Sequence, residues 1–295
     1  GGKSSILRRF CSDRRSVYIE CVQGSLDDNL RLIAGVLGSL DGTQHGPYQY
    51  IAEALDDIVS SCRPERTAVV FDELPYLLTT GEHIASSLQH FMDLIDRETD
   101  SMVIMCGSSV SVMKRETTDY DRPLYGRFDH RMEVLPLTFA ECSEFHPDMP
   151  GMDRLMLYLT VGGMPRYHMD TVSKDYRSYV IRHFLSPDGD FRDEAEGILS
   201  MEFAPLDRYL AIVNAISDGK TSQKEIIEST KLEKTMCLRC LESLSEVGIV
   251  DTVHPMMGAP KRPVYRIRDS MVAFCQDVVV ASRRHPLEDP EKKYD

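Results

Sequence analysis

The sequence lacks the features of a membrane or secreted protein. No apolar stretch approaches the roughly 18 residues that a membrane helix needs, and the longest apolar runs, residues 67–71 and 102–106, have the length of a strand. No basic region followed by an apolar core opens the chain, so we expect no signal peptide. The eight cysteines are scattered and often lie in apolar runs, as reduced, buried thiols do. We therefore expect a cytoplasmic protein that does not enter a membrane.

Positive charge is also scarce. The formal net charge is −13 over 295 residues, which argues against a protein coated in nucleic acid, because basic clusters drive phosphate binding. Residues 220–268 are the exception, with nine basic side chains against six acidic ones. If the protein contacts DNA, we expect the contact in this segment.

Short apolar strands alternate with longer helices in the first half of the chain. We expect strands at residues 17–22, 67–71, 102–106 and 133–135. We expect helices at residues 3–10, 27–40, 50–61 and 82–98. This alternation predicts an α/β fold, with a parallel sheet that is covered on both faces.

The strand pattern stops after residue 136. Helices are expected at residues 138–145, 152–161, 173–185 and 190–201, separated by Pro and Gly. Three further helices, at residues 206–216, 222–228 and 233–247, precede a strand pair at 249–253 and 264–267, which is the winged-helix plan. The predicted domains are an α/β core (1–137), a helical lid (138–203), a winged helix (204–285) and a tail (286–295).

The chain opens with Gly1-Gly2-Lys3-Ser4-Ser5, the second half of the Walker A phosphate loop G-x-x-x-x-G-K-[ST]. Gly2 lets the backbone approach a phosphate, and the N–H groups that follow, to Ser5, point at it. Lys3 would reach the β- and γ-phosphates of ATP, and the Ser4 hydroxyl would ligate Mg²⁺. The first glycine of the motif and its strand are expected upstream of residue 1. An ordinary helix N-cap is the alternative.

A Walker B pattern follows in Ala68-Val69-Val70-Phe71-Asp72-Glu73. Asp72 at the strand end would hold Mg²⁺ opposite Ser4, and Glu73 would polarise the attacking water as a base. Two solvated carboxylates are the alternative. The strand at 17–22 lies between the two motifs, as in the NTPase branch that uses a catalytic glutamate. Together the motifs predict a P-loop NTPase.

Four further segments extend this pattern along nearly the whole chain. They are Phe71-Asp72-Glu73-Leu74-Pro75-Tyr76-Leu77; Gly107-Ser108-Ser109 after an apolar strand; Leu124-Tyr125-Gly126-Arg127 with Leu135-Pro136-Leu137; and Gly162-Gly163-Met164-Pro165-Arg166-Tyr167. In order and spacing the chain resembles the archaeal ATPases of the AAA+/STAND group of P-loop proteins. The resemblance implies ATP and Mg²⁺ as ligands.

Four residues of these segments are candidates for the site. Ser108 could contact the γ-phosphate or hold the water, or belong to a strand-end turn. Arg127 is a candidate arginine finger, and a surface salt bridge is its alternative. The resemblance implies that Gly163 and Pro165 form the G-x-P element that packs against adenine; a break between two helices is the alternative.

Two features of the C-terminal part concern possible metal and DNA binding. Cys237-x-x-Cys240 has no second pair and lies on an apolar helix face, so we expect core packing rather than zinc. The candidate DNA contacts are Lys231, Lys234, Arg239, Lys261 and Arg262. A winged helix that contacts protein is the alternative.

The sequence thus favours an Mg-ATP-dependent molecular switch with Glu73 as the hydrolytic base. One rival is a nucleotide-regulated DNA-binding module with little hydrolysis. The other is an inactive scaffold that binds a protein partner or a second copy of itself.

Overall fold

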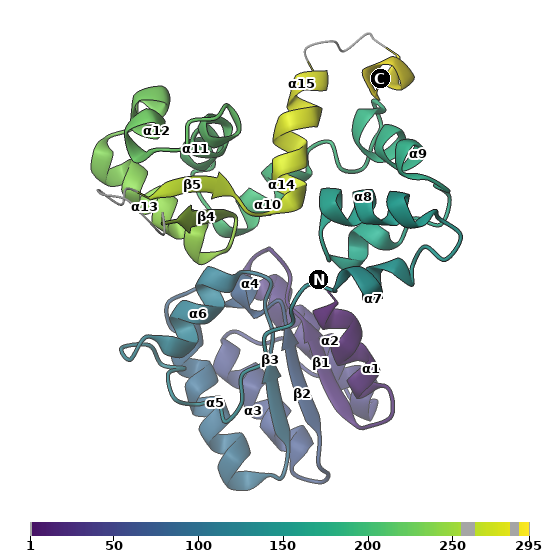
Figure 1. Ribbon diagram of the computed structural model, residues 1–295. Coiled ribbons are helices and arrows are strands. Elements are labelled where there is room, and N and C mark those ends of the chain that lie inside the picture. Colours follow the sequence, from purple (N-terminus) through teal and green to yellow (C-terminus); the bar gives the residue numbers. More distant parts are fainter. Residues whose placement is uncertain (1, 255–262, 284–288, 295) are drawn as a thin grey trace. The chain divides into compact units, whose positions relative to one another are not determined.

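The computed structural model describes residues 2–254, 263–283 and 289–294 (Figure 1). Gly1, Lys261 and Arg262 therefore lie outside the described residues. The chain divides into two compact units, Gly1–Val134 and Leu135–Asp295, which are described separately.

The first unit contains a parallel sheet of β1 (Ser16–Glu20), β2 (Ala68–Asp72) and β3 (Met102–Met105), in the order β1-β2-β3. Every residue of the central strand β2 is buried, as its uninterrupted apolar run predicts for a sheet covered on both faces. Glu20 pairs with Asp72, and Phe71 with Met105. The predicted α/β class with a parallel sheet is confirmed.

Six helices accompany these strands in the described part of the first unit. They are α1 (Lys3–Cys11), α2 (Leu26–Asp41), α3 (Ile51–Cys62), α4 (Leu74–Leu78), α5 (Ile84–Glu98) and α6 (Val110–Thr118). The apolar faces of α2, α3 and α5 form one core with the sheet, through residues such as Ile33, Ile58 and Leu88. The helices α4 and α6 are the next elements after β2 and β3, respectively, and were not predicted.

The strand predicted at 133–135 is wrong, because these residues have no regular structure. The Leu135 side chain is 67% exposed, so the apolar pattern does not mark a buried strand here. Nearby, the Leu137 N–H donates to the Gly163 carbonyl at 2.7 Å, a backbone contact outside any sheet.

The second unit is mainly helical. Its longer helices are α8 (Gly151–Val161), α10 (Glu194–Glu202), α11 (Asp207–Ser217), α12 (Gln223–Thr230) and α13 (Lys234–Glu246). Shorter helical segments are α7 (Phe139–Ser143), η1 (Pro165–His168), α9 (Tyr176–Val180), η2 (Ile181–Leu185), α14 (Ser270–Phe274), η3 (Cys275–Val279), α15 (Val280–Ser282) and α16 (Pro290–Tyr294). The two strands β4 (Val250–Val253) and β5 (Val264–Ile267) pair antiparallel.

One continuous apolar core joins the two halves of this unit. It includes Leu157 and Phe184 from the region predicted as a lid, together with Ile212, Leu244 and Val272 from the region predicted as a winged helix. The predicted boundary between lid and winged helix, at residues 203/204, therefore does not coincide with a gap in the core. This boundary stays a prediction.

Helices α11, α12 and α13 and the β4–β5 pair occur in the predicted order. A capping box opens α12: the Glu225 N–H donates to Ser222 Oγ, and the Glu225 carboxylate accepts from the Ser222 N–H at 3.0 Å. Cys237 and Cys240 are buried in α13, and the described residues contain no group of three or more His, Cys, Asp or Glu that could hold a metal.

In the described segments, none of the helices has the length and apolarity needed to cross a membrane.

Candidate nucleotide site

The first turn of α1 presents backbone donors to an anion. Gly2 is the N-cap residue, and the first helical bond runs from the Ile6 N–H to the Gly2 carbonyl at 3.0 Å. The earlier N–H groups have no intrahelical acceptor, and the helix dipole adds partial positive charge there. No acidic residue occupies this turn, although acids are favoured at helix starts. The turn that carries Lys3 and Ser4 therefore suits a phosphate.

Asp72 lies at the carboxyl end of β2 and is only 1% exposed. Its Oδ2 atom accepts a hydrogen bond from the Tyr18 hydroxyl at 2.6 Å, and its Oδ1 atom accepts one from the Glu73 N–H at 3.1 Å. Burial alone would raise the pKa of Asp72, but these hydrogen bonds outweigh it and lower the pKa below its usual range. The Ser4 side chain lies close enough to Asp72 to help lower the pKa of its carboxyl group, and the role of both residues as metal ligands stays a prediction.

Lys3 lies near Cys106, which directly follows β3. Burial, and after it the Asp72 charge, raise the pKa of the Cys106 thiol to about 12, while the Lys3 ammonium acts in the opposite direction. Lys3, Ser4 and Asp72 thus share one edge of the sheet. A hydroxyl and a carboxylate are the hard oxygen ligands that Mg²⁺ prefers, so the donor set fits this metal.

Glu73 has an unusual backbone conformation, with φ 55° and ψ 41°. This left-handed region is costly for a residue with a Cβ, and it is often occupied at functional sites. The Glu73 Oε2 atom accepts two hydrogen bonds from Ser108, at 3.0 Å from the N–H and 2.7 Å from Oγ. The predicted base and the predicted polar sensor are therefore in direct contact.

Close packing between two loops supports this contact. A Cβ added to Gly107 would lie 2.6 Å from Pro75 Cδ, so a larger residue would push the β3 end away from the start of α4. Gly107 precedes Ser108, and Pro75 follows Glu73 by two residues. The Gly-Ser-Ser and Asp-Glu-Leu-Pro motifs are thus two sides of one packed contact.

A known protein family matches more than half of the chain. Residues 2–169 match the model of a family described as an ATPase domain predominantly from Archaea. The chain belongs to this family of archaeal ATPases.

One curated relative shares about a quarter of its residues with this ATPase chain. An uncharacterized protein of Methanocaldococcus jannaschii, MJECL04, is 24% identical over 275 residues, which are 92% of this chain and 60% of that protein. The chain thus spans about 60% of the length of this curated relative.

Two solved structures share the fold. The Walker-type ATPase PABY2304 of Pyrococcus abyssi has a TM-score of 0.70 and 20% identity, covering 93% of this chain and 87% of that one. The ORC2 protein of Aeropyrum pernix has a TM-score of 0.52 and 12% identity, covering 97% of this chain and 83% of that one.

Arg127 of the ATPase chain pairs with Asp93 on α5. Among the described residues, the hydrogen bonds and ion pairs of its guanidinium include none to Asp72, Glu73 or Ser108. Its role as an arginine finger stays a prediction, and the ion pair accounts for its present position.

Gly163 has a structural role that the sequence did not show. A Cβ at this position would lie 2.0 Å from the Leu137 carbonyl oxygen, and the Gly163 carbonyl accepts from the Leu137 N–H. Pro165 begins η1. Two motifs that are distant in sequence, Leu135-Pro136-Leu137 and Gly163-x-Pro165, therefore meet in the second unit, and adenine binding by the latter stays a prediction.

Sequence reasoning missed Tyr18, Cys21 and Cys106 at the site. The negative charges of Asp72 and Glu73 contribute to raising the pKa of Cys21, after burial as the main cause, to about 12. All three residues lie in predicted strands, whose side chains are expected to be buried in the core. Cys21 and Cys106 could have been found because they directly follow β1 and β3, and parallel strands have their carboxyl ends at one edge of the sheet.

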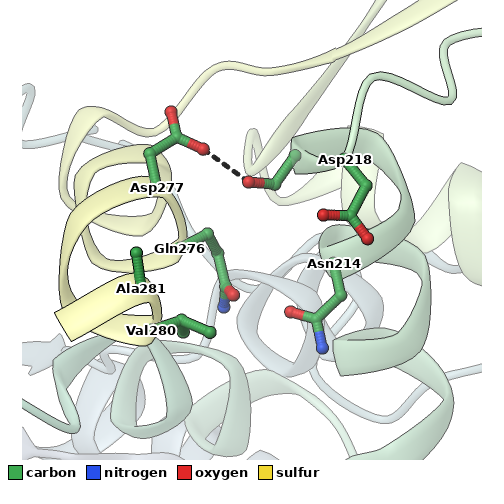
Figure 2. Close-up of a pocket in the computed structure, with 7 residues that line it drawn as sticks. Asn214, Asp218, Gln276, Asp277, Val280 and Ala281 are labelled. Carbon is green, nitrogen blue, oxygen red and sulfur yellow. Dashed lines mark hydrogen bonds between the residues drawn. The ribbon is translucent and has the colours of Figure 1, made fainter. Parts of the chain in front are cut away.

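The second unit also contains a polar pocket of about 400 Å³. Figure 2 shows Asn214 and Asp218 on one side and Gln276 and Asp277 on the other, with the Asp277 carboxylate accepting from the Ser217 hydroxyl at 2.5 Å. None of the motif residues lines this pocket, so it is not the site that the sequence predicted.

Proposed function

We propose that the protein binds Mg-ATP at the carboxyl edge of the sheet in its first unit and hydrolyses it. The observation that carries this proposal is that α1, which begins with Lys3 and Ser4, packs against β2, which ends in Asp72 about seventy residues later. Lys3 would neutralise phosphate charge, and Ser4 and Asp72 would hold the metal. Mg²⁺ bound there would offset the charge that the triphosphate carries during phosphoryl transfer.

Glu73 is the proposed general base of the hydrolysis. Its carboxylate follows the metal-binding Asp72 by one residue, and Ser108 holds it with two hydrogen bonds. A positioned base of this kind contributes roughly 10²- to 10⁴-fold to a rate. Ser108 would fix the carboxylate so that it faces the attacking water.

The test of this proposal is ATP binding by a Lys3→Ala variant of the full-length protein, measured by calorimetry with Mg²⁺ present. We expect binding to be lost, because the phosphates lose their ammonium partner. Lys114→Ala is the matched control, since Lys114 is an exposed lysine of the same unit on α6. Unchanged affinity in the Lys3 variant would contradict the proposal.

We further propose that the ATPase acts as a molecular switch. The second unit is large, with its own core, and would be the part that responds to nucleotide. Hydrogen exchange in the core of this unit, measured with ATP and with ADP, should differ if the switch exists. Identical exchange in both states would leave an ATPase without a switch.

DNA contact through α13 is a second candidate function. The side chains of Lys231, Lys234 and Arg239 are exposed on or just before this helix. In the winged-helix plan, α13 would be the third helix, which can face DNA. Glu242 and Glu246 are also exposed, near its C-terminal end, and would repel phosphates. Only the N-terminal half of α13 therefore suits DNA, and a protein partner remains the alternative occupant.

Gel shifts at several salt concentrations test this second candidate. If DNA binds, a Lys234→Ala/Arg239→Ala variant should bind more weakly and with a smaller salt dependence, because fewer counterions are released. Lys224→Ala is the control, since Lys224 pairs with Glu228 on α12. Equal binding by both variants would exclude α13 as the contact.

A further inference from the structure

We infer that Tyr18 is a positioning residue for the metal-binding carboxylate of Asp72. The inference rests on the proposed function, and it adds a residue that none of the nucleotide-binding motifs contains. Tyr18 lies in the middle of β1, on the strand next to the one that carries Asp72.

The strand register directs the tyrosine toward the carboxylate. Tyr18 pairs with Val70, and Asp72 follows Val70 by two residues, so the two side chains are on the same face of the sheet. The Tyr18 hydroxyl donates to Asp72 Oδ2 at 2.6 Å. Hydrogen bonds from O–H to a carboxylate are short and about twice as strong as neutral ones, so this bond restricts the rotation of the Asp72 side chain.

The tyrosine ring is itself held in place from the phosphate-loop helix. The Arg8 guanidinium lies 4.8 Å from the centre of the Tyr18 ring and pairs with Glu20 at 2.5 Å. Arg8 belongs to α1, the helix that begins with Lys3 and Ser4. A chain of contacts therefore runs from α1 through Tyr18 to Asp72 and connects the two halves of the proposed site.

Tyr18 differs from the other side chains near the Asp72 carboxylate, those of Ser4 and Cys106. Ser4 is a proposed metal ligand, and its hydroxyl oxygen must serve the metal when nucleotide binds. The Cys106 thiol is a weak donor. The Glu73 N–H holds Oδ1 at 3.1 Å, so Tyr18 is the strong side-chain donor that fixes the other oxygen, Oδ2. Residues that orient a metal ligand in this way are commonly worth 10- to 100-fold in metal affinity.

The test compares Tyr18→Phe with Tyr48→Phe in the full-length protein. Tyr48 donates to Asp57 Oδ2 at 2.8 Å, so the control also loses a tyrosine–aspartate bond of the first unit, at residues outside the motifs. Binding of Mn²⁺ as a substitute for Mg²⁺ is measured by electron paramagnetic resonance with a non-hydrolysable ATP analogue. Nucleotide affinity in EDTA is measured in parallel.

We expect Tyr18→Phe to weaken Mn²⁺ binding about ten-fold, with metal-free nucleotide affinity unchanged. Tyr48→Phe should bind Mn²⁺ like the wild type. Arg8→Ala keeps the hydroxyl but loosens the ring, and a smaller loss of about three-fold is expected.

Wild-type Mn²⁺ affinity in the Tyr18→Phe protein would overturn the role of Tyr18 and leave the proposed ATPase function intact. If the wild type shows no nucleotide-dependent Mn²⁺ binding, the proposed function fails as well, so the two failures are distinguishable.

Discussion

Replacement of Glu73 by glutamine separates chemistry from binding. The amide has the size of the carboxylate, and its oxygen can still accept both hydrogen bonds from Ser108. Bonds to a charged acceptor contribute about 1.5–3 kcal/mol each, and neutral ones about 0.5–1.5 kcal/mol. Because Glu73 is only partly buried, solvent screening reduces this difference, and we expect a stability loss of about 1 kcal/mol.

The effect of Glu73→Gln on hydrolysis should be far larger. An amide cannot accept a proton from water, so the rate of a single turnover should fall by roughly 10²- to 10⁴-fold. The affinity for ATP should stay close to that of the wild type, so the variant should trap bound ATP. Single-turnover hydrolysis and calorimetric ATP binding measure the two effects. Glu65→Gln is the control, since Glu65 is exposed and outside the site.

Ser108→Ala gives a graded comparison for the same site. This variant loses the 2.7 Å bond from Oγ but keeps the bond from the backbone N–H. If the lost bond contributes about 1.5 kcal/mol to holding the Glu73 carboxylate in its catalytic orientation, the activation barrier rises by that amount and turnover slows about ten-fold.

Steady hydrolysis by Glu73→Gln within about ten-fold of the wild-type rate would refute the assignment of Glu73 as the base.

Three further predictions concern other parts of the chain. Gly163→Ala should lower the free energy of unfolding by about 3 kcal/mol or more in urea titrations, because its Cβ would overlap a backbone oxygen; Gly197→Ala, with open space around it, should not. Burial lowers the pKa of His146 and of His168 below 6.5, so both stay neutral in the folded state while the unfolded chain takes up protons. Their contribution to the free energy of unfolding is present above pH ~6.5 and is lost as the pH falls. A His146→Gln/His168→Gln variant should therefore show a smaller loss of stability between neutral and acidic pH in urea titrations. Arg127→Ala should slow turnover about 10³-fold or more if Arg127 is a finger, and should change stability by less than about 1 kcal/mol if it is only an ion pair.

The sequence predicted the parts of the site that follow from local chemistry. A buried apolar run that ends in Asp72-Glu73 specifies both a strand and two carboxylates at its end. Gly2-Lys3-Ser4 specifies a helix start that suits phosphate. Parallel strands place their carboxyl ends at one edge of a sheet, which puts Asp72 at the end of β2 beside the end of β3.

The missed features depend on register and packing, which a single sequence does not determine. Tyr18 reads as one more apolar strand residue, and its bond to Asp72 requires the pairing of β1 with β2. Cys106 likewise reads as core. Gly163 looked like a ligand-binding glycine, whereas the backbone of Leu137 already requires a residue without Cβ there. The false strand at 133–135 arose because a short apolar segment resembles a strand regardless of its exposure.

The most direct test of the central claim is a crystal structure of the full-length protein with Mg²⁺ and a non-hydrolysable ATP analogue. The account predicts that the metal lies about 2.1 Å from Ser4 Oγ, on the side facing Asp72, with the Lys3 ammonium on the phosphates. A nucleotide bound elsewhere, with Lys3 and Asp72 both free of it, would contradict the account.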